Sequence, residues 1–378
     1  MNNLIRIRKE LHKIAELSGQ EMQTARKVIS ILESTNPDKM ITEIGGYGVA
    51  AVYNESSTGL TLMFRAELDA LPIQESNNFD YKSQADGVSH KCGHDGHMTI
   101  LIGLARKIKD FLADISCRIV LLFQPAEETA EGAYAVINNE KFKEIEPDYI
   151  FGFHNLPGFP LNSIILRNGT FASASVGMTA TLTGETSHAG HPEDGVSPVL
   201  AMTNIIQGLL AIPSLHTRLD RAANITIIHS KMGEVAFGTS PGYAEVMATF
   251  RSHKNEEMDI MRNNASSLID GISATYGLKH TISWSENFPA LENNIKLVGN
   301  IESVAERSQR SCIRIEKPFP WSEDFSWFTS KYSGVFFGIG SGEDHVQLHN
   351  SYYDFPDEII EPTVEYIIEI IIEMDKES

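Results

Sequence analysis

Apolar positions in the first part of the chain switch between helical spacing and short continuous runs. Apolar side chains recur near the helical period over residues 4–16 and 21–32, which predicts an opening pair of helices. Three apolar runs that end in polar or Gly/Pro-containing segments are typical of buried parallel strands: residues 60–64, 118–123 and 149–153. Between the first two runs, residues 97–111 carry apolar side chains on one face and predict the crossover helix of a βαβ unit.

The pattern changes near residue 175, where a strand begins that alternates apolar and polar positions. The elements predicted from here on are strand, helix, strand, strand, helix and strand: residues 176–183, 196–210, 224–228, 243–251, 256–276 and 278–284. This order is that of a compact split βαββαβ unit, which can be inserted between two halves of a larger domain. The larger domain then resumes with a predicted helix at 295–307, a strand at 334–339 and a last helix around 366–374.

A length of 378 residues also suggests two domains. We therefore predict an α/β protein whose larger domain is discontinuous, with residues 1–175 and 287–378 forming a mixed sheet flanked by helices. Residues 176–286 form an inserted ferredoxin-like α+β domain in this prediction.

Composition and charge limit the partners and the compartment. The formal net charge of −19, with no local Lys/Arg cluster, would repel phosphate backbones and anionic lipids, so we expect neither nucleic acid nor membrane as a partner. Residues 1–20 lack the features of a secretory signal, and the run 366–374 is far short of the ~20 apolar residues of a membrane span. Three widely separated cysteines cannot form a disulfide framework, which favours a reducing, cytoplasmic compartment: Cys92, Cys117 and Cys312.

The densest group of reactive side chains lies at residues 91–97, at the start of the predicted crossover helix. It contains Cys92, His94, Asp95 and His97. Thiolate and imidazole ligands favour zinc or a similar transition metal, and Cys-x-His spacing lets two ligands converge on one ion. The alternative is a buried cysteine beside solvated histidines, which is about as frequent for an isolated Cys-x-His pair but less so for a group this dense.

Three further segments add ligands at strand ends or in loops. Glu127 and Glu128 follow the apolar run 118–123, His154 ends the run 149–153, and His349 lies in a Gly-rich acidic loop. Ligands gather at the carboxyl ends of strands in α/β sheets. A lone histidine is more often structural, and a glutamate pair is more often solvated. Together, however, the segments supply the thiolate, imidazole and carboxylate groups of a two-metal hydrolase.

The same segments make the sequence resemble the metallo-aminoacylase group, which includes hippurate hydrolases, indoleacetyl-amino-acid hydrolases and N-acetyldiaminopimelate deacetylases. The resemblance covers nearly the whole chain and adds these segments to those above: residues 7–12, 16–21, 65–72, 187–192 and 322–325. It implies a zinc-peptidase-like catalytic domain with an inserted lid that commonly mediates dimerisation, and hence a homodimer through the lid. Two divalent metal ions per subunit, Zn, Mn, Co or Ni, are implied as cofactors.

The resemblance also implies a role for each site residue. Cys92 would bridge two metals, with His94 and His154 completing one site and Glu128 and His349 the other. Glu127 would be the general base, Asp69 would orient the centre, and His188 at the edge of the lid would stabilise the tetrahedral oxyanion. The implied reaction is hydrolysis of an N-acyl amino acid, acetylated or benzoylated for example, to a carboxylic acid and a free amino acid.

Substrate contacts are assigned with less support. Arg251, Asn155 and Gly238 are the candidates; Arg251 would pair with a substrate carboxylate, although a surface arginine at a strand end is an equal alternative. Two positions depart from the group: Glu67 replaces a more common Asp, and Gly238 replaces an Asn that helps to hold the substrate in relatives. The second departure puts the substrate preference in doubt.

Three other functions are compatible with these residues. Cys92 could be the nucleophile of a thiol hydrolase with His94 or His97 as base, but Glu128, His154 and His349 would then have no role. A dipeptidase or carboxypeptidase would use the same centre, although such relatives usually carry Asp at the position of Cys92. A non-catalytic metal-binding protein of this fold would have no use for Glu127 as a base.

Overall fold

A computed structural model of the chain describes residues 2–376, which form two compact units. The first unit contains the chain up to Phe171, residues Leu291–Pro318 and the chain from Glu323 onward, and the second contains Ala172–Ala290 and Phe319–Ser322. The α/β fold class is confirmed, as is the βαββαβ order of the second unit. The function of residues 176–286 as a lid stays a prediction.

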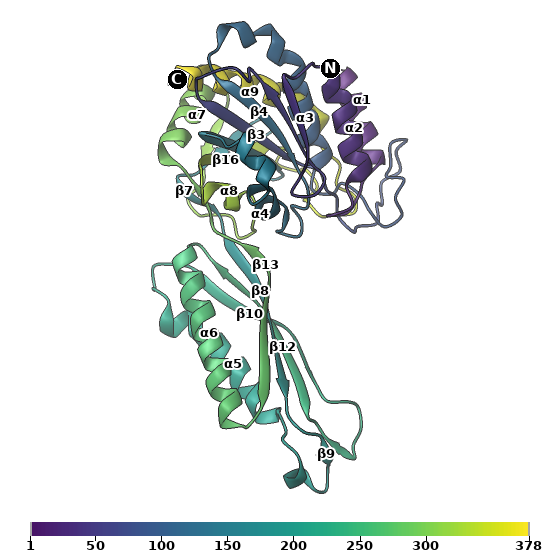
Figure 1. Cartoon of the computed structure of the whole chain (residues 1–378), viewed down its shortest axis with the longest axis vertical. Helices are drawn as coiled ribbons and strands as arrows, with labels where there is room; N and C mark the ends of the chain where they lie inside the picture. The colour runs from purple at the N-terminus through teal and green to yellow at the C-terminus, as the bar shows by residue number, and fades with distance from the viewer. Residues whose placement is uncertain (1, 377–378) are drawn as a thin grey trace. The chain divides into compact units, whose positions relative to one another are not determined.

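The first unit is built on an eight-stranded mixed sheet (Figure 1). Its strands run in the order β1 (Lys39–Ile44), β2 (Gly48–Tyr53), β4 (Arg118–Gln124), β3 (Thr61–Glu67), β5 (Tyr149–Leu156), β16 (Ser333–Gly340), β6 (Ile164–Leu166) and β15 (Cys312–Arg314). The central strands β4, β3, β5 and β16 are parallel, as their continuous apolar runs predict. The antiparallel β1–β2 pair at one edge was not predicted.

Helices cover both faces of this sheet. One layer packs around α3 and α9 and is formed by α1 (Asn2–Lys13), α2 (Met22–Glu33), α3 (His94–Lys107), α7 (Ile295–Arg307) and α9 (Ile360–Asp375). Phe151 and Phe153 of β5 belong to the core beneath this layer. Gly152 faces the other side, because side chains alternate along a strand, and there it meets Phe325. This face also carries two short helices, α4 (Gly132–Ile137) and α8 (Ser326–Thr329). The second of them begins directly after Phe325.

The helix α3 begins three residues earlier than its apolar pattern predicts. Its first residue is His94, preceded by Gly93 in a left-handed conformation with φ 97°. His94 and Asp95 are polar and lie outside the predicted helix, and His97 is its first predicted residue, yet all three are buried. Buried polar side chains in the first turn of a helix require specific partners.

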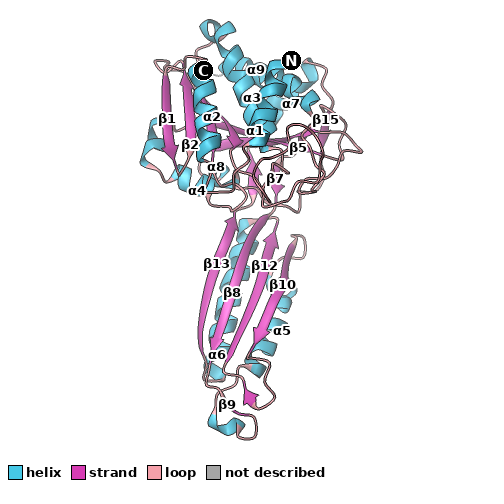
Figure 2. Cartoon of the chain, turned by 90° about the vertical axis from the view of Figure 1, so that its right-hand side faces the viewer, coloured by secondary structure: helices cyan, strands magenta, loops and turns pink. Residues whose placement is uncertain are grey.

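The second unit is an antiparallel sheet in the order β10 (Ala223–Met232), β12 (Tyr243–Ser252), β8 (Ala174–Thr183) and β13 (Lys279–Phe288). Helices α5 (Val199–His216) and α6 (Asn255–Thr275) pack together on one face of it (Figure 2). Buried and partly exposed residues alternate along most of β8 and β12, as a sheet with one covered face requires. Two short two-stranded ribbons complete the strands. In the second unit, β9 (Ser187–His188) pairs antiparallel with β11 (Thr239–Ser240). β7 (Gly169–Ala172) pairs with β14 (Leu291–Asn293), and residues 169–171 and 291–293 belong to the first unit.

Within residues 2–376, one helix, α5, is long and apolar enough to cross a membrane by length and composition alone. Only 22% of it is buried. The buried positions recur at helical spacing and belong to the core of the second unit: Ala201, Ile205, Leu209 and Ile212. The opposite face exposes large apolar side chains, of which Leu200, Leu210 and Leu215 are the most accessible.

Candidate metal centre

The parallel strands of the first unit deliver the candidate ligands to one edge of the sheet. β3 ends at Glu67, two residues before Asp69, and β4 ends at Gln124, three residues before Glu127. His154 lies near the end of β5. The carboxyl ends of these strands meet because β3 pairs in parallel with both β4 and β5.

The five expected ligands form two groups that share Cys92. In each group the possible ligand atoms lie within 4.8 Å of one another: Cys92, His94 and His154 in the first, and Cys92, Glu128 and His349 in the second. Cys92 Sγ is 3.2 Å from His154 Nε2, and Glu128 Oε1 is 3.8 Å from His349 Nε2. The assignment of these side chains as ligands stays a prediction, but the fold brings all five together.

Two polar atoms in this cluster are buried without a hydrogen-bond partner. They are His94 Nε2 and Glu128 Oε1, which lie 3.9 Å apart. Unpartnered buried polar atoms are rare in native proteins and often mark a missing ion or water. A divalent cation between them would satisfy both, so the residues fit a bound metal.

In the two buried histidines of the cluster, His94 and His154, the ring nitrogen Nδ1 is hydrogen-bonded to a backbone carbonyl. His94 Nδ1 lies 2.9 Å from the oxygen of Asp69, and His154 Nδ1 lies 2.8 Å from that of Asn155. Because a carbonyl only accepts, both Nδ1 atoms donate, and the Nε2 lone pairs face the cluster. Metal-binding histidines are commonly oriented in this way.

The cluster attracts positive charge. Burial disfavours a charge on His94, but a hydrogen bond to Asp69 and the carboxylates of Glu67 and Glu128 raise its pKa to about 10. Burial, counteracted in part by His94, raises the pKa of Glu128 to about 7. Bound cations would displace the proton from the imidazole and favour the ionised carboxylate.

Glu127 is set apart from Glu128 by its neighbours. Burial and the carboxylates of Glu323, Glu128 and Asp324 raise the pKa of Glu127 well above its usual value. Its Oε2 lies 3.8 Å from His94 Nε2. A carboxylate whose affinity for a proton is raised, next to a metal ligand, is suited to remove a proton from water.

Asp69 connects the cluster to two loops. Its Oδ2 accepts hydrogen bonds from Ser18 Oγ at 2.7 Å and from the backbone of Glu128 at 3.0 Å. Burial alone would raise the pKa of Asp69, but the hydrogen bonds from His94, Glu128 and Ser18 hold it below its usual value. The carboxylate is therefore ionised and holds the segment that carries Glu128, which supports its expected role in orienting the centre.

A buried ionic network lies beside the cluster, and sequence reasoning gave it no role. Arg65, fully buried, donates to Gln124 Oε1 at 2.8 Å and pairs with Glu67, Asp324 and Glu323. Two signals pointed to it: Arg65 is a charged residue directly after the apolar run 60–64, and Arg65, Glu67, Glu323 and Asp324 all lie in segments that carry the resemblance. From Glu67 the network continues to His97, whose Nδ1 lies 2.7 Å from Glu67 Oε2 and whose Nε2 lies 2.7 Å from Asn155 Oδ1. Asn155 Nδ2 in turn donates a 2.6 Å hydrogen bond to the hydroxyl oxygen of Tyr353.

The remaining expected site residues differ in their surroundings. Asn155 is fully buried with both ends of its amide occupied, which favours orientation of His97 over contact with a substrate. His188 is exposed in the β9–β11 ribbon. Gly238 directly precedes β11, and its oxygen accepts a hydrogen bond from Ala189 N at 2.9 Å. A Cβ at Gly238 would meet no atom within 4 Å, so space does not require glycine. Arg251 Nη1 donates to Pro320 O at 2.8 Å.

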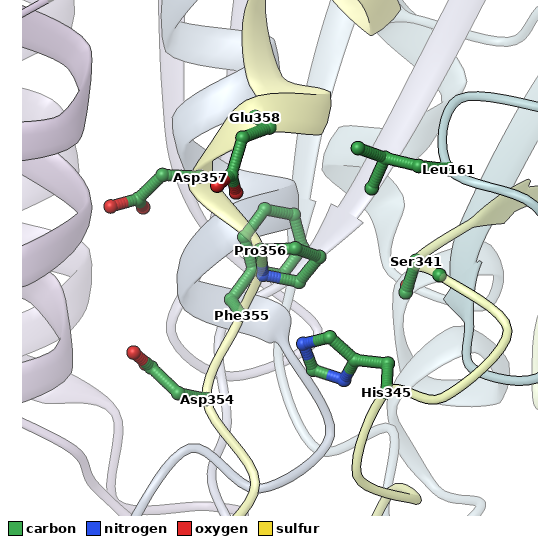
Figure 3. Close-up of a pocket in the computed structure, with 9 residues that line it drawn as sticks. Leu161, Ser341, His345, Asp354, Phe355, Pro356, Asp357 and Glu358 are labelled. Atoms are coloured by element: carbon green, nitrogen blue, oxygen red, sulfur yellow. The ribbon is translucent and has the colours of Figure 1, made fainter.

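The segment that carries His349 also lines a hollow of about 490 Å³ (Figure 3). On one side of the hollow lie Leu161, Ser341 and His345. Asp354 and Asp357 lie on the other side, and their carboxylates point away from these three residues. Both carboxylates accept a 2.8 Å hydrogen bond from Arg8 of α1. The chain after His349 is therefore fixed to the helical layer.

Comparisons with known proteins cover almost the whole chain. The chain is 28% identical over 369 residues to the N-acetylcysteine deacetylase of Bacillus subtilis, covering 98% of this chain and 96% of that protein. It is 29% identical over 369 residues to the hippurate hydrolase of Campylobacter jejuni, covering 97% and 95%. A crystal structure of a Bacillus subtilis protein described as a dinuclear metal binding peptidase of family M20 matches with a TM-score of 0.84 and 26% identity, covering 99% and 98%.

A family profile extends over the candidate metal centre. The profile of peptidase family M20/M25/M40 matches residues 63–373, which run from β3 to α9 and include Cys92, both adjacent glutamates and His349. Since this match covers most of the chain, the protein belongs to peptidase family M20/M25/M40.

Proposed function

We propose that the protein is a metal-dependent amidohydrolase that cleaves N-acyl amino acids into a carboxylic acid and a free amino acid. The observation that carries the proposal is the Cys/His/Glu cluster, in which Cys92, His94 and His154 are buried and the atoms His94 Nε2 and Glu128 Oε1 have no hydrogen-bond partner. The names of the two relatives, a deacetylase of N-acetylcysteine and a hydrolase of hippurate, support this substrate class because both act on an acylated amino acid.

Two divalent cations are proposed as cofactors. Cys92 would bridge them, His94 and His154 would complete one site, and Glu128 and His349 the other, as the two ligand groups allow. Zn, Mn, Co and Ni all suit this mixture of thiolate, imidazole and carboxylate. Bound there, the cations would supply Lewis acidity toward the amide carbonyl and toward a water molecule.

The chain's own residues would move the protons. Glu127 would accept a proton from the attacking water and later donate it to the departing amine, for which its raised proton affinity is suited. His188 would stabilise the oxyanion: its Nδ1 accepts from Gly190 N at 3.0 Å, which leaves the proton on Nε2 as an exposed donor. Asp69 would hold Glu128 and His94 in place.

A thiol hydrolase is the less favourable reading of the same cluster. Cys92 Sγ is within 3.2 Å of His154, as a nucleophile and its base would be. However, burial and the nearby carboxylates of Glu128 and Glu127 raise the pKa of Cys92 well above its usual value. Without bound cations the sulfur is therefore a neutral thiol, which is a poor nucleophile.

Removal of metal is expected to abolish hydrolysis of N-acetyl amino acids and hippurate, and addition of Zn²⁺, Mn²⁺ or Co²⁺ is expected to restore it. The measurement is the rate of amino acid release before chelation, after it and after reconstitution. Activity that survives chelation would favour the thiol hydrolase. Dipeptides in the same panel test the peptidase alternative, and absence of activity over the whole panel would favour a non-catalytic metal-binding protein.

We further propose a homodimer formed through the second unit. β10 is an edge strand that pairs only with β12 among the described residues, and it exposes Ile228. α5 exposes Leu200, Leu210 and Leu215. An open sheet edge beside exposed apolar side chains favours association with another chain.

Sedimentation at micromolar concentration is expected to give a dimer. The double variant Leu210→Glu with Ile228→Lys is expected to sediment as a monomer, because charges would replace the apolar contact. Ile295→Glu, which changes an apolar residue of the first unit that is somewhat more exposed than Leu210 or Ile228, serves as the control and should remain dimeric. A wild-type protein that sediments only as a monomer would contradict the proposal.

The proposed location is the cytoplasm. Cys92, Cys117 and Cys312 form no disulfide bond with one another, and the first two are buried. Free thiols persist in a reducing compartment.

A further inference from the structure

The side chain of Lys91 is fully buried beside Cys92, although the proposed chemistry has no use for it. Lysine is almost never fully buried unless its charge is paired. All three hydrogen-bond donors of its ammonium group are used: Glu75 Oε1 accepts at 2.6 Å, the backbone oxygen of Tyr353 at 2.7 Å and Asn77 Oδ1 at 3.1 Å. The group is therefore fixed in one position.

Lys91 contacts the segment of His349 at two points. Its backbone oxygen accepts a 2.8 Å hydrogen bond from His349 N, and its side chain reaches Tyr353 O four residues later. Between these two points the chain is partly exposed, and His349 itself has a left-handed backbone with φ 63° and a side chain that is 52% exposed. Such a backbone is costly for histidine and needs support from its surroundings.

The carboxylate that binds Lys91 belongs to a larger ionic network. Glu75 Oε1 also lies 3.0 Å from His12 Nε2, and His12 Nδ1 lies 2.8 Å from Asp95 Oδ2. Asp95 directly follows His94 in the first turn of α3. The network therefore connects the turn that holds His94 to Lys91, and Lys91 to the loop of His349.

From this geometry we infer that Lys91 is a positioning residue that holds His349 within reach of Cys92 and Glu128. The inference rests on the proposed metal centre. His94 lies on a helix and His154 on a central strand, so neither is carried by the loop that Lys91 binds directly. His349 lies on a loop, and the ammonium group of Lys91 fixes that loop. Loss of the ammonium group should weaken only the metal site to which His349 contributes.

Substitution of Lys91 by methionine tests this selectively, because methionine has a similar length and no charge. The metal-free protein is titrated with Co²⁺, and binding is followed by metal analysis and by the cobalt–thiolate absorption. Wild type is expected to bind two ions. Lys91→Met is expected to bind the first ion normally and the second about 10- to 100-fold more weakly, the usual effect of losing a partner that orients a ligand. His349→Ala should show the same selective loss.

Two further variants separate positioning from folding. Lys91→Met combined with Glu75→Gln removes the buried charge together with its partner, so no unpaired charge remains to destabilise the fold. Lys107→Met removes a lysine of α3 that pairs with Glu361 at 2.9 Å and should bind both ions as wild type does. Circular dichroism reports whether each variant is folded.

The possible outcomes are distinct. If wild type binds no Co²⁺, the proposed function fails. If wild type binds two ions and the folded Lys91 variants bind both with unchanged affinity, only the role of Lys91 fails. Loss of the folded state in both Lys91 variants would also overturn the inference, because Lys91 would then be required for the fold and not for one ligand.

Discussion

Substitution of Glu127 by glutamine is expected to lower kcat for an accepted N-acyl amino acid by about 10²- to 10⁴-fold, the usual contribution of a positioned general base. Glutamine has nearly the same shape but cannot take a proton from water. The side chain is buried beside Glu323 and Asp324, whose charges raise its proton affinity. Removing one negative charge from this group should not expel the cations, because the two proposed ligand groups that share Cys92 hold them without Glu127, although Glu127 also lies within 4.8 Å of possible ligand atoms of His94 and Glu128.

The same substitution is expected to have different effects at the two adjacent glutamates, Glu127 and Glu128. Glu127→Gln is expected to retain two metal ions with little change in KM, whereas Glu128→Gln should lose one ion. Glu131→Gln, which changes an exposed glutamate four residues after Glu127, is the matched control and should keep full activity. The assignment of the base would be wrong if Glu127→Gln turned over substrate at the wild-type rate with both ions bound.

Spacing alone could not assign different roles to these two glutamates, since neighbouring side chains outside a helix can point in any direction. The structure gives the two side chains different neighbours. Ala126 has a left-handed backbone with φ 52°, and the turn that follows it directs Glu128 toward His349 and Glu127 toward Glu323. A left-handed alanine is not signalled by residue type, because such conformations are usually occupied by glycine or asparagine.

Sequence was informative where the candidate residues are fixed by strands. The apolar runs of β3, β4 and β5 identify parallel neighbours, and polar residues at their carboxyl ends must then lie at one edge of the sheet. Glu127, Glu128 and His154 could therefore be placed near one another from local pattern. The same reasoning correctly gave the order of elements in the second unit.

Sequence was silent where a contact joins distant segments without periodicity. Lys91 binds Tyr353, 262 residues away, and Arg65 binds Asp324, 259 residues away. Residue type alone predicts that a lysine or an arginine lies on the surface. Burial of such a charge depends on partners that only the folded chain supplies. Asn155, expected to contact substrate, is occupied by such a network.

Substitution of Cys92 by alanine is expected to remove both metal ions and to lower activity by about 10³-fold or more, since metal ions contribute several kcal/mol of charge stabilisation in the transition state. Cys92 is the one residue common to both ligand groups. Each site would keep only two protein ligands, fewer than the three or four that hold catalytic or structural zinc. Metal analysis after dialysis and the rate of amino acid release measure the two effects.

A second substitution distinguishes a bridging ligand from a nucleophile. Cys92→Asp replaces the thiolate by a carboxylate, which can also bridge two cations but cannot carry out the thiol reaction. If Cys92 is a bridge, this variant should recover metal binding and a measurable part of the activity that Cys92→Ala loses. If Cys92 is the nucleophile, both variants should be equally inactive, and alkylation of the metal-free wild-type thiol should be fast despite its burial. Burial and the nearby carboxylates raise the pKa of Cys92, so the thiol ionises readily only when cations are bound beside it. We therefore expect slow alkylation of the metal-free protein.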